Sequence, residues 1–237
     1  MAVLSGIHPV TEALRTGRPL DRVLVAQGAG GPKVQAIVEL ARQAAIPVRF
    51  EPRAALDRVA GTPAHQGVVA LGAAKKYTDL DAVSTSGILV VLDGVEDPHN
   101  LGAIIRSAHA AGASGVVIPE RRAAGLTDVV AKAAAGALEH LPVIRVTNIN
   151  RTLEELKERG YWIYGLDERG AEDYDRVEFS APTALVLGAE GKGLHEQVRK
   201  HCDMLLRIPM AGKISSLNVS VAAGVVLFEW KRRSRST

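Results

Sequence analysis

The second half of the sequence alternates strand-like apolar runs with segments of helical periodicity, and this alternation is the strongest constraint on the fold. Such alternation is typical of a largely parallel sheet with helices on both faces, an α/β fold. In the last helical segment, Val221, Val225 and Phe228 recur at helical spacing and predict an apolar face. The strand-like runs are residues 87–95, 115–119, 142–146, 161–167, 183–190 and 204–210, and the helical segments are 101–112, 127–141, 149–160, 195–202 and the end of 212–230.

A smaller α/β layer precedes this unit. Residues 22–71 read as strand, helix, strand, short helix and strand. The polar stretch AAKKYTDLDAVSTS that follows has no clear period and looks like a linker. We therefore predict a front domain at 1–72, a linker at 73–86 and a larger domain at 87–237.

Composition supports a buried core and argues against several classes of protein. Apolar residues make up 47% of the chain but aromatic residues only 4%, which suits a parallel sheet covered by helices. No apolar run reaches the roughly 18 residues of a membrane span, and the start MAVLSGIHPV lacks the pattern of a signal peptide. Cys202 is the only cysteine, so we expect no intrachain disulfide and a cytoplasmic protein.

The charge is unevenly distributed along the chain. Residues 1–80 carry ten Lys or Arg against six Asp or Glu, whereas residues 81–230 carry fifteen against twenty. The tail KRRSRST is again basic. A basic front module attracts polyanions such as RNA or DNA, although this excess also fits an ordinary solvated surface.

Three polar loops follow strand-like runs. In open α/β sheets, ligands bind outside the carboxyl ends of the strands, so we expect these loops to share one edge. The first loop is GVEDPHNLGAIIR (94–106), the second is GAEGKGL (188–194) and the third is PMAGKISSLN (209–218).

The first two loops each contain a polar residue with more than one interpretation. Asn100 is a good cap for a helix beginning at Leu101, and Arg106, taken alone, fits an exposed helical position. In the second loop, glycines allow close approach of backbone to a ligand, and Glu190 between them could bind a ribose or face a cation. The loop matches neither G-x-G-x-x-G nor a P-loop, which disfavours dinucleotide and triphosphate sites.

The third loop carries more polar groups than a helix start needs. Ser215 or Ser216 could cap the last helix, yet Asn218 and Ser220 follow closely. Free N–H groups, hydroxyls and an amide at one helix start form a polar cradle. With the apolar floor of residues 208–210, that cradle suits a nucleoside-like ligand better than a bare phosphate.

Taken together, the three loops resemble the three motifs of the SpoU family of RNA ribose 2′-O-methyltransferases, within the SPOUT superfamily. The motif sequences here are NLGAIIRSA, LVLGAEGKGL and IPMAGKISSLNVSVAAGVVLFE, in the family's order. LSGIHPVTEAL and HQGVVA near the start are similar to the family's substrate-binding module, which has an L30e-like fold. LDGVEDPHNLGA and PVIRVTN look closest to members that methylate a guanosine of 23S ribosomal RNA.

The resemblance implies a fold, a cofactor and partners. It implies an α/β trefoil-knot domain of the SPOUT type that binds S-adenosylmethionine, a smaller L30e-like domain that binds RNA, and a homodimer with the active site near the interface. No metal and no membrane are implied. By resemblance the cofactor contacts are Gly188, Ile208, Met210 and Leu217.

The resemblance also implies roles for polar residues. Arg106 matches the family's catalytic arginine, and we expect it to hold an RNA phosphate because arginine is not deprotonated in proteins. The other catalytic candidates are Asn100, Glu190, Ser216 and Asn218, of which Asn100 and Ser216 could instead be plain helix caps. His65 and Gln66 are candidates for RNA contact and could equally be turn residues.

Three alternatives remain open from the sequence. The substrate could be tRNA instead of rRNA. The chain could be a non-catalytic RNA-binding factor in ribosome assembly, although Arg106 and the glycines of the second loop are present. A nucleotide-dependent oxidoreductase is disfavoured by the missing G-x-G-x-x-G.

Overall fold

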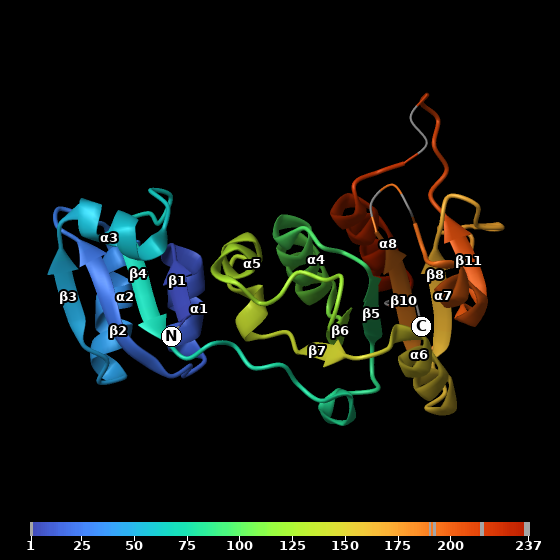
Figure 1. Ribbon diagram of the computed structural model, residues 1–237, viewed down its shortest axis with the longest axis horizontal. Coiled ribbons are helices and arrows are strands. Elements are labelled where there is room, and N and C mark those ends of the chain that lie inside the picture. Colours follow the sequence, from blue (N-terminus) through green and yellow to red (C-terminus); the bar gives the residue numbers. More distant parts are fainter. Residues whose placement is uncertain (1, 190, 192, 214–215, 235–237) are drawn as a thin grey trace. The chain divides into compact units, whose positions relative to one another are not determined.

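Figure 1 shows the computed structural model, which describes residues 2–189, 191, 193–213 and 216–234. Two compact units follow from the contacts within the chain. Unit 1 contains Met1–Lys76 together with Gly125–His140, and unit 2 contains Tyr77–Ala124 and Leu141–Thr237. The first unit is therefore assembled from two separate stretches of sequence.

Unit 1 is built on a four-stranded sheet with the order β1-β4-β2-β3. Strand β4 is antiparallel to both β1 and β2, while β2 and β3 are parallel. The alternation predicted for residues 22–71 is confirmed. The strands are β1 (Ala2–Ser5), β2 (Leu20–Ala26), β3 (Val48–Glu51) and β4 (Val68–Gly72), and the helices are α1 (Ile7–Arg15), α2 (Pro32–Gln43) and α3 (Arg53–Ala60).

The segment 127–141 does not form the single helix predicted from its periodicity. Helix α5 (Asp128–Ala133) ends early, and a short 3₁₀ helix, η2 (Ala137–Glu139), follows it. Between them the backbone enters the left-handed region, with φ of 50° at Ala135 and 95° at Gly136, so a continuous helix is excluded. The buried pair of Arg18 and Glu139, 2.6 Å apart, joins this segment to the rest of unit 1.

Unit 2 contains a seven-stranded sheet in which all neighbouring strands among the described residues are parallel. The order is β7-β6-β5-β10-β8-β11-β9, so the predicted α/β fold is confirmed. The strands are β5 (Ile88–Asp93), β6 (Gly115–Pro119), β7 (Val143–Val146), β8 (Trp162–Leu166), β9 (Glu172–Asp173), β10 (Thr183–Gly188) and β11 (Met204–Arg207). The helices are η1 (Leu80–Ala82), α4 (Pro98–Ala111), α6 (Ile149–Glu158), α7 (Glu196–His201) and α8 (Val219–Arg233).

Both faces of this sheet are covered. On one face, Leu89 and Val91 of β5 join a buried cluster with residues of α6 and α7. On the other, α4 and α8 pack against each other and against β6 and β10. In the described part of the chain no helix combines the length and apolar character that crossing a membrane requires. The trefoil knot stays a prediction from the resemblance.

Helix α8 presents its apolar residues differently from the prediction. Val221 and Phe228, expected on the packed face, are 51% and 52% exposed. Six other residues form the buried face, which is enriched in small side chains that permit close packing on α4. They are Val219, Ala222, Ala223, Val226, Leu227 and Trp230. Of the predicted stripe, Val221 and Phe228 therefore face solvent in a single chain, whereas Val225 is half-buried.

Candidate functional site

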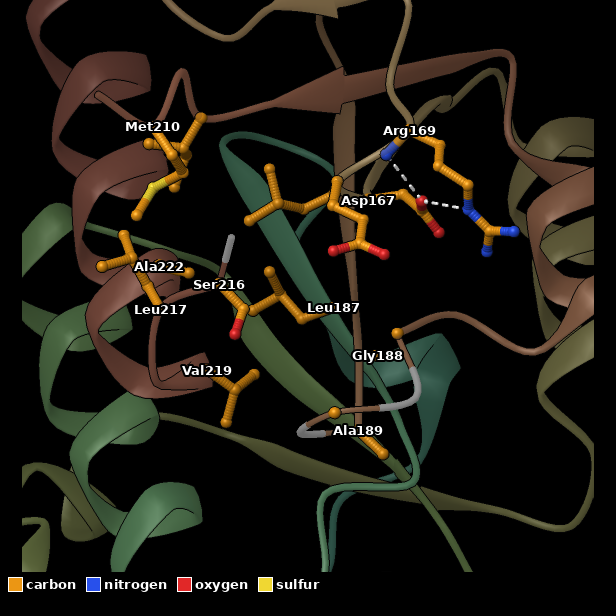
Figure 2. Close-up of a pocket in the computed structure, with 15 residues that line it drawn as sticks. Asp167, Arg169, Leu187, Gly188, Ala189, Met210, Ser216, Leu217, Val219 and Ala222 are labelled. Carbon is orange, nitrogen blue, oxygen red and sulfur yellow. Dashed lines mark hydrogen bonds and ion pairs between the residues drawn. The ribbon is translucent and has the colours of Figure 1, made fainter. Parts of the chain in front are cut away.

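The carboxyl ends of β8, β10 and β11 surround a cavity of about 360 Å³ in unit 2 (Figure 2). Strand order explains the convergence, because β10, β8 and β11 are neighbours and run in the same direction. The start of α8 closes the cavity with Val219 and Ala222. The second and third loops thus meet at one edge of the sheet, as the sequence predicted.

Backbone and apolar side chains form much of the cavity wall. Leu187, Gly188 and Ala189 contribute at the end of β10, and Val219 and Ala222 at the start of α8 (Figure 2). All four residues that the resemblance assigned to the cofactor line this one cavity: Gly188, Ile208, Met210 and Leu217. The structure thus brings these residues together, and their contact with a cofactor stays a prediction.

Gly188 is held tightly against the loop that follows it. A Cβ atom added at Gly188 would lie 2.1 Å from the carbonyl carbon of Gly193, which is too close for any side chain. Ala189 and Gly193 form an isolated bridge that closes the loop. Glu190, a predicted catalytic residue, lies outside the described residues.

A charged rim on the cavity was missed by the sequence analysis. Asp167, Glu168 and Arg169 line it. The Asp167 side chain is only 1% exposed, and it accepts hydrogen bonds from Arg199 at 2.9 Å and from Arg169 at 3.2 Å. These residues follow the strand-like run at 161–167, so the rule that selected three loops could have selected this fourth one.

A second, smaller cavity of about 230 Å³ adjoins the first, since Ala189 and Val219 line both. The rest of its wall comes from the first loop: Gly94, Val95, Glu96, Asp97 and Asn100. Asn100 is 6% exposed, and its Oδ1 accepts a hydrogen bond of 2.9 Å from the side-chain amide of Asn218. Two predicted catalytic residues therefore meet beside this cavity.

Both predicted helix caps are wrong. Helix α4 is capped by Asp97, whose Oδ1 accepts the backbone N–H of His99 at 2.7 Å, and Asn100 lies inside the helix. Helix α8 is capped by Asn218, whose Oδ1 accepts the backbone N–H groups of Ser220 and Val221. Ser216 instead lines the larger cavity, and Ser215 lies outside the described residues.

Arg106 lies apart from both cavities. It is exposed on α4, and it is absent from the described residues that line either cavity. Six helical positions separate it from Asn100, which places the two side chains on different sides of α4. A role for Arg106 at this site therefore needs either a substrate that reaches around the helix or a second chain.

His65 and Gln66 have structural contacts in unit 1. The His65 side chain is fully buried; its Nδ1 accepts the N–H of Gly67 at 3.0 Å, so its Nε2 donates to Asp57 at 2.8 Å. Gln66 has a φ of 56°, and its Oε1 accepts the N–H of Ile7 at 3.0 Å. Of the two interpretations, the contacts favour turn residues, and a buried His65 side chain offers no surface to RNA.

Cys202 is unsuited to nucleophilic chemistry. Burial, reinforced by the nearby Asp203, raises the pKa of its thiol to about 12, so the thiolate is scarce at neutral pH. Within the described ranges, no three His, Cys, Asp or Glu side chains are placed to hold a metal ion.

The chain belongs to the SpoU methyltransferase family. Residues 87–228 match the model described as the SpoU rRNA Methylase family. Residues 3–78 match the model described as RNA 2′-O ribose methyltransferase substrate binding. The family uses S-adenosylmethionine as its cofactor.

Similar proteins span nearly the whole chain. YacO of Bacillus subtilis (strain 168), assigned by name to the TrmH family of tRNA/rRNA methyltransferases, is 46% identical over 235 residues, which are 96% of this chain and 94% of that protein. The SpoU methyltransferase AviRb from Streptomyces viridochromogenes, solved with AdoMet, superposes with a TM-score of 0.84 at 30% identity, covering 99% of this chain and 91% of AviRb. The AdoMet-bound rRNA methyltransferase from Sinorhizobium meliloti gives a TM-score of 0.82 at 27% identity, covering 98% of this chain and 87% of that one.

The larger cavity fits S-adenosylmethionine. Its volume of about 360 Å³ lies within the range of about 300–1,000 Å³ of small-molecule sites. Backbone at Gly188 and Ala189 supplies hydrogen-bonding groups for an adenine, and Ile208, Met210 and Leu217 supply apolar surface. The rim carries both signs of charge, since Asp167 is paired with Arg199 and Arg169 while Glu168 adds a further carboxylate, and S-adenosylmethionine likewise carries cationic groups and a carboxylate.

Proposed function

We propose that this chain transfers a methyl group from S-adenosylmethionine to a ribose 2′-hydroxyl of RNA, and that its substrate is a guanosine of 23S rRNA. One observation carries the proposal: the cofactor-sized cavity adjoins a smaller polar cavity where Asn100 and Asn218 are paired. A methyl donor in the first would lie next to a nucleotide in the second. The lone cysteine fits a cytoplasmic location.

The extent of the structural likeness supports rRNA over tRNA. The S. meliloti rRNA methyltransferase covers 98% of this chain, and so includes its front module. The structure titled for 2′-OH methylation of C/U34 on tRNA covers only 65% of this chain, at a TM-score of 0.59 and 27% identity. A tRNA target remains the second candidate, because YacO is named for both RNAs.

The residues of the site have distinct tasks in this proposal. The cofactor supplies an activated methyl group, so the chain has to align two reactants and accept one proton. Asn100 and Asn218 orient the ribose through their paired amides. Ser216, on the wall of the larger cavity, helps to orient the target nucleotide and to shape the cofactor loop. The same task is predicted for Glu190, which lies outside the described residues.

Arg106 binds the phosphate beside the target ribose. Its guanidinium stays protonated and offers paired donors, which stabilise negative charge developing on the 2′-oxygen. Arg106 is absent from the described lining of both cavities of its own chain, and we propose that the arginine at each site comes from a second copy. The exposed Val221 and Phe228 on α8 give such a homodimer an apolar contact surface.

Two substitutions test the dimer. Phe228→Glu would place a charge on the exposed face of α8 and should convert a dimer to a monomer in analytical ultracentrifugation. Trp162→Glu is the matched control, since Trp162 is a 43% exposed aromatic residue on another element. A dimer that survives Phe228→Glu would contradict the assigned interface.

The function is tested by incubating the protein with methyl-labelled S-adenosylmethionine and either unmodified 23S rRNA or tRNA. After alkaline hydrolysis, label in a resistant dinucleotide shows 2′-O-methylation, because the blocked hydroxyl prevents cleavage. We expect label from 23S rRNA, and a loss of at least about 100-fold in Arg106→Ala. Label from tRNA alone would mean that the substrate is tRNA and not 23S rRNA. No label from either RNA would contradict the proposed methyl transfer.

A further inference from the structure

At the carboxyl end of β5, Asp93 is paired with His195, which precedes α7. The proposed function gives neither residue a role. Asp93 is the last residue of β5 and is 6% exposed. Both of its carboxylate oxygens lie 2.9 Å from Nδ1 of His195, and Oδ2 also accepts the backbone N–H of His195 at 2.8 Å. The ring is therefore held by its side chain and its backbone together.

This pairing determines where the histidine carries its proton. A carboxylate can only accept hydrogen bonds, so Nδ1 is the protonated nitrogen. In the neutral ring, Nε2 then has a free lone pair and can accept a proton. The same division of roles operates in the Ser-His-Asp triad, where the aspartate orients the histidine that acts as the base.

The histidine lies close to the smaller cavity, next to two residues of its wall, Gly94 and Ala189, without being one of the described residues that line it. Gly94, which follows Asp93, lines that cavity, and a Cβ atom at Gly94 would lie 3.6 Å from Cε1 of His195. The same Cβ atom would lie 3.5 Å from Cβ of Ala189, which lines both cavities, so the imidazole ring is near the point where the two cavities meet. The His195 side chain is 48% exposed, which leaves it accessible to a substrate.

We propose that Nε2 of His195 accepts the proton of the ribose 2′-hydroxyl and that Asp93 positions it. This inference rests on the proposed function. As the O–H bond breaks toward Nε2, the 2′-oxygen forms its bond to the methyl carbon, and the electron pair of the broken methyl–sulfur bond stays on sulfur. The positive charge thereby moves from the sulfonium to the imidazolium of His195, beside Asp93. The imidazolium releases the proton from Nε2 to water afterwards.

A general base that already carries a proton cannot accept another, so this step should make methyl transfer slower toward acidic pH. Other charged groups lie on the elements around His195 and affect the same pH dependence. They are Glu96 and Asp97 in the first loop, Glu196 on α7, and the pair of Asp167 and Arg199. Variants of His195 itself are therefore needed to show that the loss of activity at acidic pH, the acidic limb of the pH–rate profile, comes from this residue.

The decisive variant is His195→Asn, which keeps an amide N–H for Asp93 but has no basic nitrogen. Single-turnover methyl transfer to 23S rRNA should slow by about 10²–10⁴-fold, the usual contribution of a general base. The acidic limb of the pH–rate profile should disappear, while the Kd for S-adenosylmethionine stays within about threefold. His201→Asn on the same helix, where His201 contacts Glu154, is the matched control and should leave the rate unchanged.

The outcomes separate this inference from the proposed function. Wild-type protein that methylates RNA while His195→Asn retains its rate and acidic limb would overturn only the role of His195. Wild-type protein that methylates no RNA would overturn both. A ¹⁵N NMR spectrum of the neutral ring gives a readout without turnover: we expect Nδ1 protonated and Nε2 bare, and the reverse tautomer would contradict the proposal.

Discussion

The two adjoining cavities share Ala189 and Val219 yet differ in how their walls are made. The larger one presents backbone of β10 and apolar side chains, backed by the buried pair of Asp167 and Arg199. The smaller one presents the polar side chains of Glu96, Asp97 and Asn100, and Asn100 accepts a hydrogen bond from the Asn218 side chain. A wall of the first kind suits a ligand of fixed shape, and a wall of the second kind suits orientation of a reactive group. Substitutions should therefore separate cofactor affinity from turnover.

The largest effect on cofactor binding should come from Gly188→Ala. Its Cβ would meet the Gly193 backbone at 2.1 Å, so the second loop would have to move away from the cavity wall. We expect the Kd for S-adenosylmethionine to rise by at least about 100-fold in isothermal titration calorimetry, the loss of about 2.7 kcal/mol of binding free energy.

Gly212→Ala is the matched control for that experiment. Gly212 lies in the third loop with no atom within 4 Å of an added Cβ atom, so affinity should be unchanged. Normal binding by Gly188→Ala would mean that the loop is not part of the cofactor site.

Asn218 tests the smaller cavity through two variants. Asn218→Ala removes the cap of α8 and the hydrogen bond to Asn100, and should lower the free energy of unfolding by about 1–2 kcal/mol. Asn218→Asp keeps a capping oxygen but cannot donate to Asn100. Denaturant unfolding should show near-normal stability for Asn218→Asp, while single-turnover methylation slows about tenfold or more. Equal losses of stability in both variants would assign Asn218 to the fold alone.

Leu217→Ala should have the smallest effect. The side chain lines the larger cavity but is 38% exposed, so little apolar area is lost from the folded protein. If a cofactor covers it, removing three carbons should weaken binding by about 1–2 kcal/mol, roughly 5–30-fold in Kd. Calorimetry should show this change with turnover at saturating cofactor nearly unaltered. An unchanged Kd would place the cofactor away from this side of the cavity.

The residues that lie at the carboxyl ends of the strands could be predicted well from the sequence, because their positions follow from the order and direction of the strands. The strand-like runs of unit 2 were confirmed, and Gly188, Ile208, Met210 and Leu217 converge because parallel strands end at one edge. The capping residues could not be chosen, since Asn218 competes with Ser216 for the same orphan N–H groups and only geometry decides. The histidine at 195 was missed because its partner, Asp93, is distant in sequence.

The choice between RNA contact and a turn at His65 could not be made from the sequence for a related reason. A histidine in a basic module suggested RNA contact. In the structure, the buried His65 ring accepts a hydrogen bond from Gly67 and donates one to Asp57, and these tertiary contacts cannot be read from the sequence. Likewise, helical periodicity in residues 127–141 could not reveal the left-handed turn at Ala135 and Gly136. In each case the residue types were compatible with two local structures, and contacts between residues distant in sequence determined which one forms.

The most direct test of the central claim is mass spectrometry of nucleosides from 23S rRNA after incubation with S-adenosylmethionine that carries a deuterated methyl group. We predict that the deuterated methyl appears in 2′-O-methylguanosine, at one position of the RNA. Deuterium in a base-methylated nucleoside, or in no nucleoside at all, would contradict the assignment of the two cavities to a methyl donor and a ribose.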